Sequence, residues 1–505
     1  MIARAREHIN NREQGRLAGL LSVIDARLAD IDVERLLLDG LLPTPHEAYL
    51  TGTYPPLKAM RDVSAGEVFA AAAGTISLYV HIPFCRQRCT FCHFAKEIRP
   101  QAERVHLYLD ALAEEMRLVS RALGDRRRVA SVYVGGGTPS SLDPEHVEHV
   151  LAALGTTFGL DDATELTFEL HPQVVRDPNR LAAQLLALLG GGVNRIAFGA
   201  QALDDGILHT LNRGHSAQDV VDLVDFLQVR EFRNFSVDLM YGLPDESLEG
   251  WYATLSTLVG LGVPKLNIFP LFFKVTDPIS SLYERRPDRF PDGWQRLRTH
   301  FLTDAYLSEQ GYRTGPVLYY SRDDRHSIQQ ELKFDDSDDV DLVGLGVSSF
   351  GYLGGTQYYN HCTIDDYLES IGRGDPPVWR GETLGTDERA RRAVMFGLRS
   401  AGVPRRPFAG RFGQAPEELL PEIDEFAERG LLTCADDVWH ATGIGSYCID
   451  PMAARFASEQ VRRRVRATNR RLTEPRRSPI EQHDYSPLGR SGASVPHPRP
   501  SRSRR

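Results

Sequence analysis

Between residues 75 and 310 the sequence alternates short β-rich runs with longer amphipathic segments. The runs, rich in Val, Ile, Leu and Phe, lie at 77–82, 131–135, 165–170, 194–199, 235–240 and 265–270. The segments between them carry apolar residues at helical spacing and lie at 102–122, 143–157, 178–189, 216–228 and 247–261. Such alternation builds βα units around a parallel sheet. Six units predict an α/β fold whose core is a partial (β/α)6 barrel.

Three of the six cysteines directly follow the first β-rich run, in the order C-x3-C-x2-C: Cys85, Cys89 and Cys92. Three thiolates this close can bind one soft metal centre, and thiolate ligation favours an iron–sulfur cluster over magnesium or calcium. Three ligands would leave one iron of a [4Fe–4S] cluster open, which indicates catalysis. The alternatives are a structural zinc knuckle or three buried thiols, but no fourth Cys or His follows at finger spacing.

This stretch resembles the cluster loop of the radical S-adenosylmethionine (SAM) superfamily. Tyr79-Val-His81-Ile-Pro-Phe-Cys85 is similar to the opening of the coproporphyrinogen III dehydrogenase, or oxygen-independent oxidase, family. The resemblance implies that the three cysteines bind a [4Fe–4S] cluster, that SAM binds the open iron, and that Tyr79 lies beside the SAM sulfonium as a cofactor-binding and catalytic residue. In the superfamily the reduced cluster cleaves SAM to methionine and a 5′-deoxyadenosyl radical, which the protein must position and shield.

The second strand ends in a glycine-rich loop, Gly135-Gly-Gly-Thr-Pro139. Glycines let the backbone approach a ligand closely and leave N–H donors for a carboxylate. The motif also fits a tight turn, but the family uses the matching loop to hold the methionyl end of SAM, which implicates Gly135, Gly136 and Thr138. Glu169, at the end of the third strand, is interpreted as a polar anchor for SAM; the alternative is a solvated rim residue.

Gln201, Arg213 and Asp238 follow the next two strands at a spacing that resembles the residues with which the family binds two SAM molecules. Arg can pair with a carboxylate in a two-pronged geometry, while Asp and Gln can hydrogen-bond ribose or adenine. The stretch around Asp238 also fits a plain strand followed by a turn. Because barrels keep their chemistry at the carboxyl ends of the strands, where these motifs fall, we expect one shared site.

Residues 311–384 are predicted to form a substrate and second-SAM segment. They include a polar region in which His326 is a candidate catalytic residue for proton transfer. They also include a glycine-rich run, 342–350, that resembles the family's segment near the second SAM.

The flanks predict three further parts. Residues 1–74 form an N-terminal helical extension, and residues 385–457 resemble the family's C-terminal helical, winged-helix-like domain. A winged helix can bind DNA, but 413–438 is acidic, so a nucleic-acid partner is not expected. Residues 459–505 hold 13 Arg and 4 acidic residues, a net +9 that leaves −18 for the rest of a chain whose total is −9. This Arg- and Pro-rich composition predicts a disordered arm over 458–505.

The composition also bears on location and partners. No apolar run reaches the ~20 residues that span a bilayer, and the N-terminus lacks the apolar core of a signal peptide. Low cysteine usage favours a reducing compartment. We therefore expect a cytoplasmic enzyme with a small-molecule substrate, no membrane partner, and an electron donor such as a flavodoxin or ferredoxin.

Two departures from the family bear on the reaction. The coproporphyrinogen enzyme carries one more cysteine two positions after the third, where this chain has Phe94. The haem-chaperone branch starts almost at the first strand and carries a His-Asn-x-x-Tyr-Trp stretch, which this chain lacks. Both departures favour the class C radical SAM methyltransferases and cyclopropane-forming enzymes, which take a carbon from a second SAM. We expect C-methylation or cyclopropanation of an sp2 carbon in a natural product; the alternatives are coproporphyrinogen or other tetrapyrrole chemistry, and a haem-binding chaperone.

Overall fold

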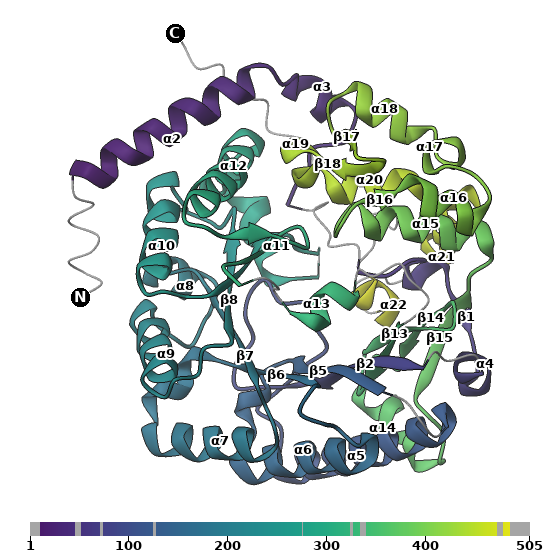
Figure 1. The fold of residues 1–505 in the computed structure, drawn as a ribbon. Helices are drawn as coiled ribbons and strands as arrows, with labels where there is room; N and C mark the ends of the chain where they lie inside the picture. The colour runs from purple at the N-terminus through teal and green to yellow at the C-terminus, as the bar shows by residue number, and fades with distance from the viewer. Residues whose placement is uncertain are drawn as a thin grey trace.

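The computed structural model describes residues 11–45, 52–70, 74–124, 128–274, 276–323, 327–333, 340–471 and 478–484. Within these residues, thirteen strands form one curved sheet with helices around its outside (Figure 1). The strand order is β1-β15-β14-β13-β12-β2-β5-β6-β7-β8-β9-β11-β10.

The centre of this sheet is the expected partial barrel. Six neighbouring strands run parallel: β2 (Thr75–Ile82), β5 (Arg128–Gly136), β6 (Glu165–Leu170), β7 (Arg195–Gln201), β8 (Phe235–Tyr241) and β9 (Lys265–Pro270). The connecting helices lie on the outer face: α5 (Ala102–Leu123), α6 (Pro144–Phe158), α7 (Pro178–Gly190), α8 (Asp205–Thr210), α9 (Ala217–Val229) and α10 (Leu248–Gly260). The α/β fold class and the six βα units are confirmed.

The two faces of the barrel strands have different chemistry. In β2, Ile76, Leu78 and Val80 are buried in the core cluster that includes the helices. The alternate residues Ser77 and Tyr79 face the barrel interior, since side chains of a strand point to opposite faces in turn. The other barrel strands repeat the pattern, so the interior is polar and the layer between sheet and helices is apolar.

A short helix, α13 (Ile328–Lys333), closes the amino-terminal end of the barrel (Figure 1). The Gln329 side-chain oxygen accepts hydrogen bonds from the hydroxyls of Ser77 and Ser131. The Glu165 carboxylate accepts one from the first N–H of the helix, at 3.2 Å. These polar contacts fix α13 at the end of the barrel opposite to the one where the predicted motifs stand.

Residues 311–384 add strands to both edges of the sheet. β11 (Tyr319–Ser321) pairs antiparallel with β9, and β10 (Arg313–Thr314) follows it. On the other side β12 (Val340–Leu345) lies parallel to β2, and the sheet continues through β13 (Phe350–Leu353), β14 (Thr356–Asn360), β15 (Val378–Thr383) and β1 (Arg61–Asp62). α14 (Ile364–Gly372) connects β14 and β15.

Helical segments flank the barrel at both ends of the chain. α2 (Asn11–Ala29) packs against α12 (Gly293–Glu309), and Arg298 forms an ion pair with Asp25 at 2.8 Å. The remaining helices before the C-terminal part are α3 (Val33–Leu38), η1 (Leu57–Ala59), α4 (Ala65–Phe69), η2 (Pro139–Ser141), η3 (Pro172–Arg176), α11 (Pro278–Arg285) and η4 (Pro287–Arg289). Among the described residues, no helix is both long and apolar enough to cross a membrane.

The C-terminal part combines helices with a small antiparallel sheet. Its strands are β16 (Val403–Pro404), β17 (Leu432–Ala435) and β18 (Val438–Ala441), with β18 in the middle. Its helices are α15 (Thr386–Gly397), α16 (Arg405–Phe412), α17 (Pro416–Leu419), α18 (Glu422–Glu428), α19 (Gly443–Tyr447) and α20 (Ile449–Phe456).

The disordered arm predicted over 458–505 is wrong for two stretches, α21 (Glu459–Arg471) and α22 (Pro479–His483). α21 packs on η1 and buries Val461 and Val465, which stand one helical turn apart. The arginines between the two valines lie on other faces of the helix. One of them, Arg462, donates hydrogen bonds to carbonyls at the end of α20. The prediction of disorder rested on the many charges of this segment and did not consider the two valines that anchor the helix. The other residues of the arm lie outside the described part of the chain.

Candidate active site

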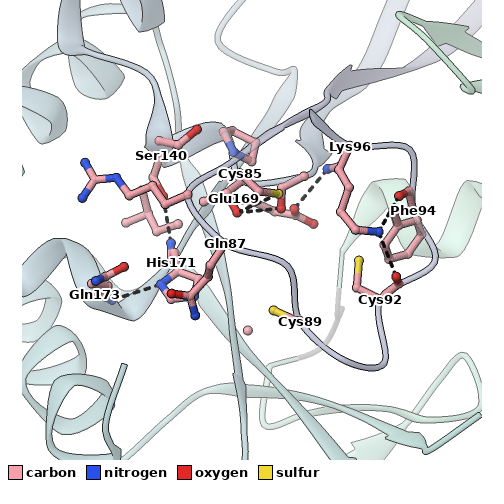
Figure 2. A pocket seen from close by; sticks show the side chains of 18 of the residues that line it. Cys85, Gln87, Cys89, Cys92, Phe94, Lys96, Ser140, Glu169, His171 and Gln173 are labelled. Atoms are coloured by element: carbon pink, nitrogen blue, oxygen red, sulfur yellow. Dashed lines mark hydrogen bonds between the residues drawn. The ribbon is translucent and has the colours of Figure 1, made fainter. Parts of the chain in front are cut away.

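A cavity of about 200 Å³ opens at the carboxyl ends of the barrel strands (Figure 2). It brings together ten of the residues singled out from the sequence: Tyr79, Cys85, Cys89, Cys92, Gly136, Thr138, Glu169, Gln201, Arg213 and Asp238. Gly135 lies just behind it, because a Cβ placed there would stand 2.9 Å from the Glu169 carboxyl carbon. These residues therefore lie around one cavity, as expected for a single shared site.

The cluster loop runs between two short paired strands, β3 (Phe84–Cys85) and β4 (Glu97–Ile98). Lys96 Nζ donates hydrogen bonds to the carbonyls of Cys92 at 2.8 Å and Phe94 at 2.9 Å, so it holds the returning half of the loop (Figure 2). On the outgoing half, Gln87 donates to the Asn212 carbonyl at 2.7 Å. The loop is thus fixed from within and tied to the turn after α8.

The surroundings of the cysteines fit a [4Fe–4S] cluster. Arg213 donates to Cys89 Sγ at 3.4 Å and Thr138 to Cys85 Sγ at 3.6 Å, and donors to sulfur tune such clusters. A Cβ at Gly137 would stand 3.0 Å from Cys85 Sγ, so a residue larger than glycine would crowd this sulfur. Among the described residues, no three His, Cys, Asp or Glu side chains converge as the ligands of one ion would.

Tyr79 is oriented by a residue that the sequence analysis did not single out. His81 Nε2 lies 2.9 Å from the Ala95 carbonyl, which can only accept, so Nε2 carries the proton. Burial lowers the pKa of His81 to about 4. The neutral ring therefore offers Nδ1 as acceptor to the Tyr79 hydroxyl at 3.1 Å. The sequence held one signal for this contact: Tyr79 and His81 are two residues apart in a strand, which places both side chains on the interior face of β2.

Two half-buried carboxyl groups face the cavity, Glu169 from β6 and Asp238 from β8. Glu169 accepts from the Tyr133 hydroxyl at 2.7 Å and from the Gly136 N–H at 3.3 Å, while Asp238 accepts from Asn267 at 2.6 Å. Burial, together with the nearby charge of Asp238, raises the pKa of Glu169 to about 7. Burial raises the pKa of Asp238 to about 6. The pair is costly to ionise in the empty protein and would be relieved by a cationic ligand.

Gln201 and Arg213 meet because β7 ends in an irregularity. The pairing with β8 shifts between Gly199 and Gln201, and Gln201 has φ +67°, so its side chain turns back over the glycine. A Cβ at Gly199 would stand only 2.4 Å from Gln201 Nε2. Arg213 donates to the Gly199 carbonyl at 2.6 Å, while its buried Nε has no hydrogen-bond partner among the described residues. That unsatisfied donor beside the cavity suits an anionic group of a ligand.

His326, the candidate for proton transfer, lies outside the described residues. The helix that follows it, α13, closes the amino-terminal end of the barrel, opposite to the cysteines. The cavity also has polar lining residues that carried no recognisable signal in the sequence: Lys96, His171 and Gln173 (Figure 2).

Known proteins resemble this chain in both of its main parts. Residues 79–258 match the Radical SAM superfamily, and residues 384–447 match the HemN C-terminal domain. The oxygen-independent coproporphyrinogen III oxidase of Pseudomonas aeruginosa is 30% identical over 400 residues, 75% of this chain and 84% of that protein. The heme chaperone HemW of Bacillus subtilis is 26% identical over 389 residues, 76% of this chain and 99% of the chaperone.

A solved structure shows the same fold. Coproporphyrinogen III oxidase of Escherichia coli, described as a radical SAM enzyme, superimposes with a TM-score of 0.68 at 23% identity, covering 81% of this chain and 96% of that one. The expected class C methyltransferase branch is not among these relatives. With its three-cysteine loop and partial barrel, the chain belongs to the radical SAM superfamily, in the family of the oxygen-independent coproporphyrinogen III oxidases, and the family implies a [4Fe–4S] cluster and SAM.

Proposed function

We propose that this protein is a radical SAM enzyme of the coproporphyrinogen oxidase type. It cleaves SAM and uses the 5′-deoxyadenosyl radical to take a hydrogen atom from a carboxylate-bearing small molecule, such as the propionate side chain of a tetrapyrrole. The observation that carries the proposal is the meeting of three cysteines, two half-buried carboxyl groups and an arginine around one cavity. The 30% identity to an oxygen-independent coproporphyrinogen III oxidase supports the type of reaction.

Each part of the cavity has a separate task in this proposal. Cys85, Cys89 and Cys92 would hold the cluster, which when bound supplies the electron for SAM cleavage. The carboxyl groups of Glu169 and Asp238 would balance the positive charges of SAM. The remaining groups orient the ligand: Tyr79 through its hydroxyl, held by His81, and the glycine loop through its N–H groups.

A second candidate is transfer of a carbon from a second SAM to an sp2 carbon. One observation favours it: Phe94 stands where the coproporphyrinogen enzyme has an additional cysteine, lines the cavity and is 49% exposed. The arrangement of Gln201, Arg213 and Asp238 would serve the second SAM in this case. This candidate has weaker support, because the relatives reported above are coproporphyrinogen oxidases and heme chaperones.

The test is an anaerobic assay of the iron-reconstituted protein with coproporphyrinogen III, SAM and dithionite. The assay also contains a one-electron acceptor, which takes the electron that the substrate radical gives up when it loses carbon dioxide. The proposal expects 5′-deoxyadenosine and carbon dioxide without S-adenosylhomocysteine. Carbon transfer instead yields deoxyadenosine and S-adenosylhomocysteine in equal amounts, and with methyl-deuterated SAM and an sp2 acceptor it places deuterium in the deoxyadenosine. Tight haem binding without deoxyadenosine would contradict both enzymatic proposals and indicate a chaperone.

A further inference from the structure

The cluster loop has a second hollow on its outer side, with a volume of about 250 Å³. Phe84, Cys85 and Val105 line it, and Arg99 and His146 stand at its rim. We call this the outer hollow. Cys85, Arg86 and Ser141 line both the outer hollow and the active-site cavity, so these residues separate the two.

The rim of the outer hollow is positively charged. Arg86 and Arg99, which line the hollow, are exposed, and neither forms an ion pair within the described residues. Asp143 also lines the hollow, but its carboxylate pairs with Arg180 at 2.7 Å. This local excess of positive charge lies on a chain whose residues 1–458 carry −18, so it stands out against an acidic body.

Arg99 is held in place by the strand pair of the loop. Its N–H donates to the Cys85 carbonyl at 2.9 Å, and its Nε donates to the Arg86 carbonyl at 3.0 Å. It has φ +50°, a conformation that residues other than glycine seldom adopt. The preceding Ile98 is 37% exposed, so an apolar side chain accompanies the charged ones. Apolar contacts ringed by charge are typical of surfaces that bind a partner transiently.

We propose that the outer hollow and its arginines are the docking surface for a small acidic protein that carries single electrons. The inference rests on the proposed function, since only a redox cluster needs such a supply. The carrier's cofactor is oxidised by one electron and the cluster is reduced by the same electron, with Cys85 between them. Complementary charge raises the rate of encounter, and this effect weakens with salt.

The test compares a chemical reductant with protein electron carriers in variants at Arg99. R99K, R99Q and R99E are reconstituted anaerobically, and SAM cleavage is followed with dithionite, with reduced flavodoxin and with reduced ferredoxin. The matched control is R230E, since Arg230 follows α9 at the opposite end of the barrel. We expect dithionite-driven cleavage to be unchanged in all four variants, because dithionite needs no docking surface.

With the carrier that drives the wild type, the half-saturating carrier concentration should rise about 3-fold in R99Q and about 10-fold in R99E at low salt. R99K and R230E should behave as wild type, and the differences should shrink at high salt. Equal half-saturation in every variant, or a wild type that accepts electrons from neither carrier while dithionite works, overturns the docking proposal. Absence of cleavage even with dithionite overturns the proposed function instead, and the docking surface with it.

Discussion

Replacing Glu169 with Gln should stabilise the empty protein while weakening its hold on SAM. Burial raises the pKa of this carboxyl group from 4.5 to about 7. At about 1.4 kcal/mol for each pH unit, keeping it ionised in the fold at pH 8 costs about 3 kcal/mol. The amide is neutral and avoids this cost, and its oxygen can still accept from Tyr133. It loses the hydrogen bond from the Gly136 N–H, worth about 1 kcal/mol. The net expectation is a gain of about 2 kcal/mol at pH 8.

The pH dependence gives the sign of the effect. A carboxyl group whose pKa is higher in the folded state binds more protons there, so its contribution to stability is complete below pH 4.5 and is lost as the pH rises through about 7. Wild type should therefore lose more stability than E169Q between pH 5 and pH 8. Asp238, with a pKa of about 6, adds a slope of the same sign, and the difference between wild type and variant reports Glu169 together with its coupling to Asp238.

The assay is denaturant unfolding of the apo protein at pH 5 and pH 8, with SAM binding measured by calorimetry at pH 8. E249Q is the control, because Glu249 is exposed at the start of α10. If the stability difference between E169Q and wild type is the same at both pH values, the buried-charge argument fails. If E169Q binds SAM as wild type does, Glu169 does not balance the charge of SAM.

Two further predictions concern the cluster and the chain end. G137A should retain little iron after reconstitution, because the new Cβ would stand 2.9 Å from the Phe84 carbonyl oxygen and 3.0 Å from Cys85 Sγ, so that the cluster loop must shift. G155A, whose Cβ meets nothing within 4 Å, should keep its iron, and equal iron in both variants would contradict the steric argument. A chain cut just before α21 exposes the sites of Val461 and Val465 and should lose about 4 kcal/mol of stability, whereas one cut just after α22 should not; equal melting midpoints would show that α21 is not anchored.

The barrel was predictable because local patterns determine it. Each strand has its own alternation of residues and each connecting helix its own apolar stripe, and the motifs stand at strand ends that a parallel sheet must bring together. Tyr79, Glu169 and Asp238 could be placed in one site for this reason, without knowledge of any contact between them.

The features that were missed depend on contacts between distant segments. The hydrogen bond that the Ser77 hydroxyl donates to Gln329 of α13 joins residues far apart in the chain and leaves no local trace in the sequence. The arm was mistaken for disorder because two valines among many arginines signal a helix only when η1 is present to cover them. Composition describes a segment alone, whereas burial depends on its partner.

The closure of the barrel by α13 has a kinetic consequence. Among the described residues, α13 covers the amino-terminal end of the partial barrel, so the cavity opens at the carboxyl end of the strands, where the cysteines lie. The ligand that binds deepest in the cavity must bind first and dissociate last, so the shape of the cavity imposes an order on ligand binding and product release. An inhibitor that fills the outer part of the cavity should therefore trap a molecule already bound beneath it, and it should slow release as well as entry.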